Sequence, residues 1–367
     1  MSGNGSSERA VAEAVLGDAV PRCRTQNEGR MPSAEICYNR RGGMSMQYRK
    51  IGKTGLRVSE ISLGSWLTYG RSVDRETAIR TIHRAYELGI NFFDTANVYA
   101  RGEAERVVGE ALRAFPRESV VIATKVFWPM GDGPNDRGLS RKHIMEQAHA
   151  SLKRLGVDYV DIYYAHRYDP ETPVEETLRA FDDLVRQGKV LYVGVSEWTA
   201  AQIREALQVA DRYLLDRIVV NQPVYNMLNR YIEKEIIPLG EKEGIGQVVF
   251  SPLAQGVLTG KYKPGVPAPA GSRGADPEAG AFVQRYLTDD QLKKAEQLAA
   301  LARELDLTPA QLALAWVLRQ PNVASAIVGA TRPEQIEENA KASGVVLSAD
   351  VLERIEAILN GEGETVR

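Results

Sequence analysis

Short apolar runs, most of them rich in β-branched or aromatic residues, recur along the chain from residue 46 onward. Eight of them are typical of buried strands: ISLGS, INFFD, VVIAT, VDIYYA, VLYVGVS, IVVNQ, QVVFS and ASAIVGA. Stretches with helical spacing of apolar positions separate them, such as DRETAIRTIHRAYELG and SRKHIMEQAHASLKRLG. Strand and helix therefore alternate, which predicts a parallel sheet covered by helices.

Eight such units over roughly 300 residues favour a closed (β/α)8 TIM barrel. The alternative, an open doubly wound sheet, would show a glycine-rich fingerprint after its first strand. Here the first strand is followed by GSWLTYGRS, which lacks that fingerprint. Ahead of it, QYRKIG, KTG and LRVSEISLG indicate a β-hairpin, because a short glycine-containing connection joins two alternating runs. We predict an α/β barrel with an N-terminal hairpin and extra C-terminal helices.

Helix boundaries carry capping residues. Asp74, Ser140 and Thr199 stand where helices should begin, and Gly89, Gly156 and Gly188 where they should end. In GATRPEQIEEN, Thr331 and Glu334 have the spacing of a capping box, with Pro333 in the first turn.

Three regions follow from composition. Residues 1–45 mix Gly, Ser, Asn and Arg without sustained periodicity, so we expect a disordered extension or, alternatively, sequence upstream of a start at Met44 or Met46. Residues 46–360 form the barrel, and residues 361–367 a short tail. Within the barrel, the Pro/Gly-rich stretch 260–280 is long enough to be a functional lid or a disordered loop.

Composition excludes several classes of protein. The chain has 367 residues, a formal net charge of −2 and 44% hydrophobic residues, a profile typical of a soluble globular protein with no basic surface for nucleic acid. No apolar run approaches the ~18–20 residues that span a membrane, and the start is unlike a secretory signal. The two cysteines, Cys23 and Cys37, precede the barrel, so we expect a cytoplasmic protein without disulfides. No metal-binding motif is present, so no metal site is predicted.

Four side chains with acid–base chemistry lie at the ends of three successive predicted strands: Asp94 and Tyr99, Lys125, and His166. Residues just past the strand ends of such a barrel share one rim, where active sites lie. A lysine paired with a carboxylate would lower the pKa of a nearby tyrosine. The other histidines, His83, His143 and His149, fall on helices where surface positions suffice.

Anion-binding features cluster after the last two strands. FSPLAQGVLTGK offers small residues for close backbone approach, and a helix N-terminus follows strand eight. Arg332, Lys261 and Arg273 supply cations in the same region.

Taken together, YRKIGKTGLRVS, NFFDTANVYA, SLKRLGVDYVD, FSPLAQGVLTGKY and VGATRPEQIEEN make residues 47–360 resemble the aldo-keto reductases. The resemblance is strongest to the branch that holds the β subunits of voltage-gated potassium channels and their bacterial relatives. It implies reduction of aldehyde and ketone carbonyls by NADPH. It assigns Tyr99 as general acid, Lys125 and Asp94 as the pair that tunes it, and His166 as the donor that orients the carbonyl.

The same resemblance implies the residues around the cofactor. They are Ser65, Trp66, Asp94, Ser196, Gln222, Phe250, Ser251, Pro252, Leu253, Ala254, Gly256, Lys261, Ser272, Arg273, Gly329, Thr331, Gln335, Glu338 and Asn339, with Asn221 as a further candidate. Aromatic residues near the rim, Trp66, Tyr69, Trp128 and Trp198, would wall a pocket for a small carbonyl substrate.

Two departures from the branch pattern bear on function. His166 stands where channel β subunits carry asparagine, which favours a competent reductase, and Glu197 stands where relatives often have arginine. Two alternatives stay open: a redox-sensing regulatory β subunit of a potassium channel, and a Schiff-base aldolase that uses Lys125. The resemblance also allows a homo-oligomer, tetramer or larger, and a membrane-protein partner.

Overall fold

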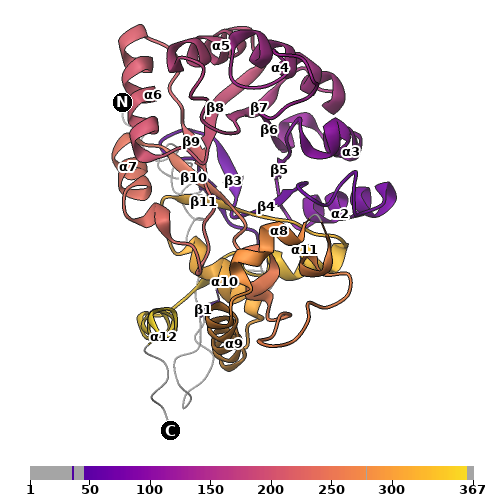
Figure 1. Ribbon diagram of the computed structural model, residues 1–367, viewed down its shortest axis with the longest axis vertical. Helices are drawn as coiled ribbons and strands as arrows, with labels where there is room; N and C mark the ends of the chain where they lie inside the picture. The colour runs from indigo at the N-terminus through magenta and orange to yellow at the C-terminus, as the bar shows by residue number, and fades with distance from the viewer. Residues whose placement is uncertain (1–34, 37–44, 278, 362–367) are drawn as a thin grey trace, which may run out of the picture.

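The computed structural model describes residues 35–36, 45–277 and 279–361. Eight parallel strands close into a barrel in chain order, which confirms the predicted TIM barrel (Figure 1). They are β4 (Ile61–Gly64), β5 (Phe92–Asp94), β6 (Val121–Val126), β7 (Val160–Ala165), β8 (Val190–Ser196), β9 (Val220–Gln222), β10 (Gly246–Phe250) and β11 (Val323–Val328). Each predicted apolar run holds one of these strands, because a strand buried on both faces needs continuous apolar sequence.

A helix follows each of the first six barrel strands: α2 (Arg75–Glu87), α3 (Glu103–Leu112), α4 (Arg141–Leu155), α5 (Val174–Arg186), α6 (Ala200–Tyr213) and α7 (Ile236–Glu243). The crossover from β10 to β11 is longer and holds α8 (Gly280–Val283), α9 (Asp289–Glu304) and α10 (Pro309–Leu318). After β11 come α11 (Pro333–Ala340), β12 (Val345–Val346) and α12 (Ala349–Asn360). In Figure 1, α9 and α12 lie beyond the ring on the side of α10, as expected for extra helices. Short 3-10 turns include η2 (Arg117–Ser119), η3 (Tyr231–Glu233) and η6 (Gln284–Tyr286).

Most of the predicted capping residues act as caps. The Asp74 carboxylate accepts a hydrogen bond from the Thr77 amide at 2.8 Å, and Thr199 forms a reciprocal capping box. Ser140 caps α4 by accepting from the backbone, and Gly156 ends that helix in the left-handed conformation at φ 69°. These contacts satisfy backbone groups that a helix end leaves unpaired.

The capping box predicted at Thr331 and Glu334 is wrong. Helix α11 begins one residue later, with Arg332 as N-cap and no side-chain cap bond. Instead, the Gln335 side chain reaches back and accepts a hydrogen bond from the Thr331 amide at 2.8 Å. The spacing of Thr331 and Glu334 is that of a capping box, but Pro333 sets the helix start.

The predicted hairpin closes the N-terminal end of the barrel. Strands β2 (Tyr48–Lys50) and β3 (Arg57–Ser59) pair antiparallel. Ile51 and Val58 are fully buried against the barrel interior. Their cluster includes Phe92, Val121, Ile162, Val220 and Val248. Since one mouth is plugged by apolar side chains, a ligand can enter only past the opposite strand ends.

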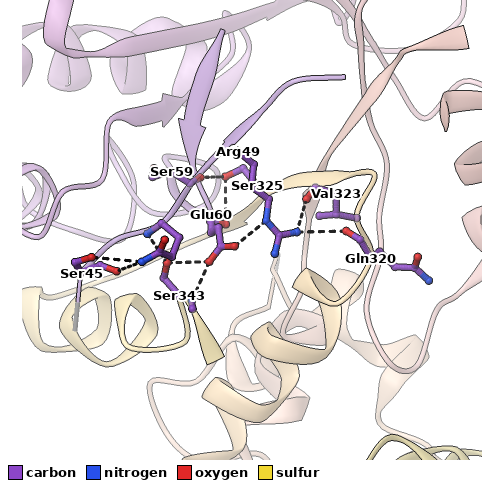
Figure 2. A network of polar contacts seen from close by, with 10 residues as sticks. Ser45, Arg49, Ser59, Glu60, Gln320, Val323, Ser325 and Ser343 are labelled. Carbon is purple, nitrogen blue, oxygen red and sulfur yellow. Dashed lines mark hydrogen bonds and ion pairs between the residues drawn. The ribbon is translucent and has the colours of Figure 1, made fainter. Parts of the chain in front are cut away.

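A carboxylate fixes the hairpin in place. Figure 2 shows Glu60, between β3 and β4, bound by Arg49 at 2.7 Å and by the Ser343 hydroxyl at 2.9 Å. The Gly344 amide donates to the same carboxylate oxygen as Ser343, and Arg49 also donates to the Val323 carbonyl at 3.0 Å. Glu60 therefore links the plug, the last barrel strand and the C-terminal segment.

Of the segment 1–45, the structure describes residues 35–36 and Ser45. Strand β1 (Glu35–Ile36) pairs antiparallel with β12. The expected disorder of the rest lies outside the described residues, as does most of the expected tail, residues 362–367. Among the described residues, no helix is long and apolar enough to cross a membrane.

Replacing Glu60 by alanine should lower the free energy of unfolding by about 2–4 kcal/mol. The change leaves the Ser343 hydroxyl, the Gly344 amide and the partly buried Arg49 without their acceptor. Urea unfolding followed by circular dichroism measures this. Glu76→Ala, which removes an exposed i,i+4 pair with Arg80, is the control and should cost about 0.5 kcal/mol or less. Equal unfolding midpoints for the two variants would contradict the role of Glu60.

Candidate active site

A cleft of about 1310 Å³ opens at the C-terminal ends of the strands. Most of the predicted site residues line it: Trp66, Tyr69, Asp94, Tyr99, Trp128, His166, Ser196, Gln222, Phe250, Ser251, Pro252, Leu253, Gly256, Lys261, Ser272, Arg273, Gly329, Thr331, Gln335, Glu338 and Asn339. Residues scattered over most of the barrel sequence thus meet in one cavity, as the rim of a parallel barrel predicts.

Five predicted residues do not line the cleft: Ser65, Lys125, Asn221, Ala254 and Trp198. Lys125 lies beneath it, and Asn221 is fully buried and donates to the Gln247 side chain at 3.0 Å. Ser65 is buried and donates to the Thr95 hydroxyl at 2.9 Å, and Ala254 is fully buried. Trp198 is only 1% exposed and packs edge-on against Tyr168 in the core, with ring centroids 5.0 Å apart. The structure therefore places Trp198 away from the expected substrate pocket.

Beneath the cleft, Lys125 on β6 forms an ion pair with Asp94 at the end of β5. Lys125 is fully buried, and its Nζ lies 2.5 Å from Asp94 Oδ1 and 2.9 Å from the Thr95 carbonyl oxygen. The third contact, to the Tyr99 hydroxyl, is 3.2 Å long. Gln222 on β9 donates to the other carboxylate oxygen of Asp94 at 2.8 Å. The three donors of the ammonium therefore each have an acceptor.

The pKa values of both partners are shifted upward. Burial raises the pKa of Asp94, and the charge of Lys125 opposes that rise. Burial alone would lower the pKa of Lys125, but the neighbouring carboxylate brings it above its ordinary value. The ion pair therefore favours the charged form of Lys125, which places a buried cation next to the Tyr99 hydroxyl.

Tyr99 lies in the short turn η1 (Tyr99–Gly102), where β5 runs into α3. Burial raises the pKa of the Tyr99 hydroxyl, although the charge of Lys125 acts in the opposite direction. The expectation of a lowered tyrosine pKa is therefore wrong in its net direction, because desolvation outweighs the cation. A raised pKa keeps the hydroxyl protonated at neutral pH, which is the state a proton donor needs.

His166 immediately follows β7 and faces Tyr99, with ring centroids 5.7 Å apart. Burial lowers its pKa well below the ordinary value, and Lys125 and Arg167 add to the effect, so the ring is neutral at neutral pH. Its Nδ1 is buried and has no hydrogen-bond partner among the described residues. An N–H costs more to leave unpaired than a lone pair, so we infer that the proton sits on Nε2.

Backbone strain concentrates around this rim. Nine non-glycine residues of the described chain have positive φ, and five of them line the cleft: Leu67, Ala100, Glu197, Ser251 and Gln255. Non-glycine residues rarely adopt this conformation, and they persist where surrounding structure imposes it. The strained loops therefore lie on the open end of the barrel, opposite the apolar plug.

One end of the cleft offers cations and an unpaired hydroxyl. Lys261, Arg273 and Arg332 line it, as predicted. The Ser272 hydroxyl is buried without a partner among the described residues, and Arg273 donates to the Gln255 side chain. A group with phosphates would supply the missing acceptor and the negative charge, so these residues fit a dinucleotide phosphate.

Described residues of the stretch 260–280 form a wall of this cleft. Its turn η5 (Arg273–Ala275) carries Arg273, and the Gly274 amide donates to the Tyr262 hydroxyl at 2.9 Å. After it, Phe282 meets Trp66 edge-on at 5.0 Å. The described part of this stretch therefore lines the cleft, and its predicted role as a lid stays a prediction.

The Glu197 carboxylate is held by protein groups and makes no cation available to an anionic ligand. Its Oε1 accepts from the Val224 amide at 2.6 Å and from the Tyr231 hydroxyl at 2.9 Å. The arginine expected from the family pattern is thus replaced by a carboxylate that ties the loop after β8 to the loop after β9.

Sequence reasoning missed Arg167, Gln255 and Phe282, all of which line the cleft. The signal for Arg167 was its position directly after His166 at a strand end; Gln255 lay inside a motif already noted. Phe282 follows the long stretch, and nothing in its local pattern indicates the site. His143 also differs from expectation, because it is 1% exposed rather than at the surface. The described residues hold no group of three or more side chains that could bind a metal ion.

Replacing Lys125 by methionine should lower the free energy of unfolding by about 3–5 kcal/mol, because Asp94 is left as an uncompensated buried charge. Adding Asp94→Asn to that variant should recover part of the loss. Urea unfolding measures both. Lys142→Met, which breaks an exposed pair with Glu146, is the matched control and should change little. A double variant no more stable than Lys125→Met would argue against a stranded charge.

The chain matches the family model described as the aldo/keto reductase family over residues 60–360. It is 48% identical to a probable voltage-gated potassium channel subunit beta of Arabidopsis thaliana over 322 residues, which are 86% of this chain and 98% of that protein. A similarly named protein of Oryza sativa subsp. japonica is 47% identical over the same shares of the two chains. A putative voltage-gated potassium channel subunit beta of Schizosaccharomyces pombe is 44% identical over 86% of this chain and 94% of its own. The chain therefore belongs to the aldo/keto reductase family.

Proposed function

We propose that the protein reduces aldehydes and ketones to alcohols with NADPH, using Tyr99 as the general acid. Membership of the aldo/keto reductase family supports an oxidoreductase activity in general. The observation that carries the finer proposal is the contact of the buried Lys125 Nζ with both Asp94 and the Tyr99 hydroxyl, under a cleft that His166 also lines.

The cofactor proposal rests on the chemistry of the cleft. When bound, NADPH supplies the hydride. Lys261, Ser272 and Arg273 would hold its phosphates, and Ser196 with Gln222 its carboxamide. Phe250 would lie against the nicotinamide ring, and the residues from Gly329 to Asn339 would frame the adenosine end.

The protein residues divide the proton chemistry. Neutral His166 donates a hydrogen bond to the carbonyl oxygen and fixes its orientation. Tyr99 gives its proton to the same oxygen as charge develops there. Lys125 then stabilises the tyrosinate through their 3.2 Å contact. Asp94 keeps the lysine charged and in place, so the cation is present before the reaction begins.

The arrangement of Lys125 argues against a Schiff-base aldolase. A Schiff-base lysine attacks as a neutral amine, which needs a lowered pKa. Here Asp94 raises the pKa of Lys125, and the side chain is fully buried. Its Nζ has acceptors on three sides.

A regulatory role is the second candidate function, favoured by the names of the relatives. All three relatives given above are named as β subunits of voltage-gated potassium channels. In this role the bound nucleotide would report redox state to a membrane protein. Measuring turnover and capture of a channel partner side by side separates the two functions.

Replacing Tyr99 by phenylalanine should remove carbonyl reduction while NADPH still binds. The ring and its packing remain, and only the transferable proton is lost, which should cost at least the ~10²–10⁴-fold of general acid catalysis. NADPH oxidation at 340 nm over a panel of aldehydes measures this, with Tyr213→Phe as the control at the protein surface. A variant that retains more than about a tenth of wild-type turnover, with chemistry rate-limiting, would exclude Tyr99 as the acid.

NADPH should bind more tightly than NADH, and the preference should depend on Lys261 and Arg273. The 2′-phosphate carries nearly two negative charges, which an arginine can meet with a charge-assisted fork. Dissociation constants from fluorescence quenching test this at fixed salt. The double alanine variant should lose the preference and release the dinucleotide faster, while Lys263→Ala, an exposed lysine paired with Glu296, should not. A preference that survives in the double variant would move the site to Thr331 and Arg332.

A further inference from the structure

Arg167 is a half-buried cation in the cleft that the proposed mechanism does not use. It immediately follows His166 and lines the same cavity. Its Nη1 donates to the His166 carbonyl oxygen at 2.6 Å and approaches the Ser196 hydroxyl at 3.5 Å. The guanidinium carbon lies 5.7 Å from the ring centroid of Trp128. The side chain is thus held over an aromatic wall of the cleft.

One edge of this guanidinium has no partner in the described part of the chain. Both of its hydrogen bonds use Nη1, so Nε and Nη2 have none. No described carboxylate lies within ion-pair distance of Arg167, whereas Arg71 and Arg332, which also line the cleft, each pair with a carboxylate. Glu197, a carboxylate that also lines the cleft, accepts from the Val224 amide and the Tyr231 hydroxyl instead. Nε and Nη2 form the edge that meets a carboxylate with two parallel hydrogen bonds.

The Arg167 guanidinium lies close to the proposed reaction centre. The His166 ring is 5.7 Å from the Tyr99 ring and 6.3 Å from the Trp128 ring. Trp128 therefore neighbours both His166, where the carbonyl would be oriented, and Arg167. A substrate lying along Trp128 would span the two with a few carbon atoms or one benzene ring.

We propose that Arg167 is an anion-recognition residue for the substrate, so that the preferred carbonyl compounds carry a carboxylate a few carbons from the aldehyde or ketone. The inference rests on the proposed reductase function and names its substrate class. A planar carboxylate suits the side-on edge of the guanidinium, and the Trp128 wall suits the apolar spacer. The cofactor phosphates have their own cations, Lys261 and Arg273, at the other end of the cleft.

The test compares two substrates that differ only in charge: 3-carboxybenzaldehyde and 3-carbamoylbenzaldehyde. In the wild type, kcat/KM for the carboxylate should exceed that for the amide by about tenfold or more, and the excess should shrink with added salt. Arg167→Met should abolish the excess and leave the amide rate within a few-fold. Arg167→Lys should keep part of it, because the charge remains without the fork. Arg212→Met, a surface change of the same charge, should behave as the wild type.

A binding measurement keeps the inference testable if turnover fails. Calorimetry with 3-(hydroxymethyl)benzoate and its amide, in the presence of NADP⁺, should show tighter binding of the carboxylate to the wild type only. Failure of both aldehydes to react would overturn the reductase proposal, and equal binding of the two alcohols would overturn the role of Arg167. Suppose instead that the Arg167→Met variant binds NADPH about tenfold more weakly but has the same kcat/KM ratio for the two aldehydes as the wild type. Arg167 would then belong to the cofactor site.

Discussion

The burial of the Asp94–Lys125 ion pair is the constraint around which the open end of the barrel is organised. Removing two charges from water costs several kcal/mol each, and only good geometry with further hydrogen bonds offsets that cost. The pair meets this condition because β5 and β6 are neighbours in the barrel and because Gln222 reaches Asp94 from β9. A parallel barrel supplies both contacts from strand ends, so the chemistry follows from strand order.

The two ends of the barrel differ in role: the hairpin end contributes stability, and the open end carries the candidate site. The hairpin side is closed by apolar packing and by Glu60, whose contacts join the plug to β11 and the C-terminal segment. At the other end, strained non-glycine residues and the buried charges coexist. Strain of this kind costs of order 1–3 kcal/mol per residue and needs a rigid surrounding structure. A plugged and well-packed lower half provides that rigidity.

The fold and the catalytic candidates could be predicted because both depend on local sequence. Continuous apolar runs identify strands, and a polar residue that ends such a run must lie at the rim. Other features depend on burial and direction, which sequence does not give. Tyr99 has a raised pKa because its desolvation exceeds the effect of Lys125. Trp198 turns into the core, although it lies in a rim loop next to Glu197, which lines the cleft. Arg167 belongs to no periodic pattern, so only the structure shows its open edge.

Desolvation sets two protonation states with one physical effect. It raises the pKa of Tyr99, which keeps a proton on the hydroxyl that we propose as the acid. It lowers the pKa of His166, which keeps the ring neutral beside Lys125 and Arg167. A charged His166 would add a third cation to this small volume and compete with Lys125 for the developing tyrosinate. Because the two shifts move away from neutrality in opposite directions, both groups keep these states across the physiological pH range, and the proposed proton transfer needs no titration to begin.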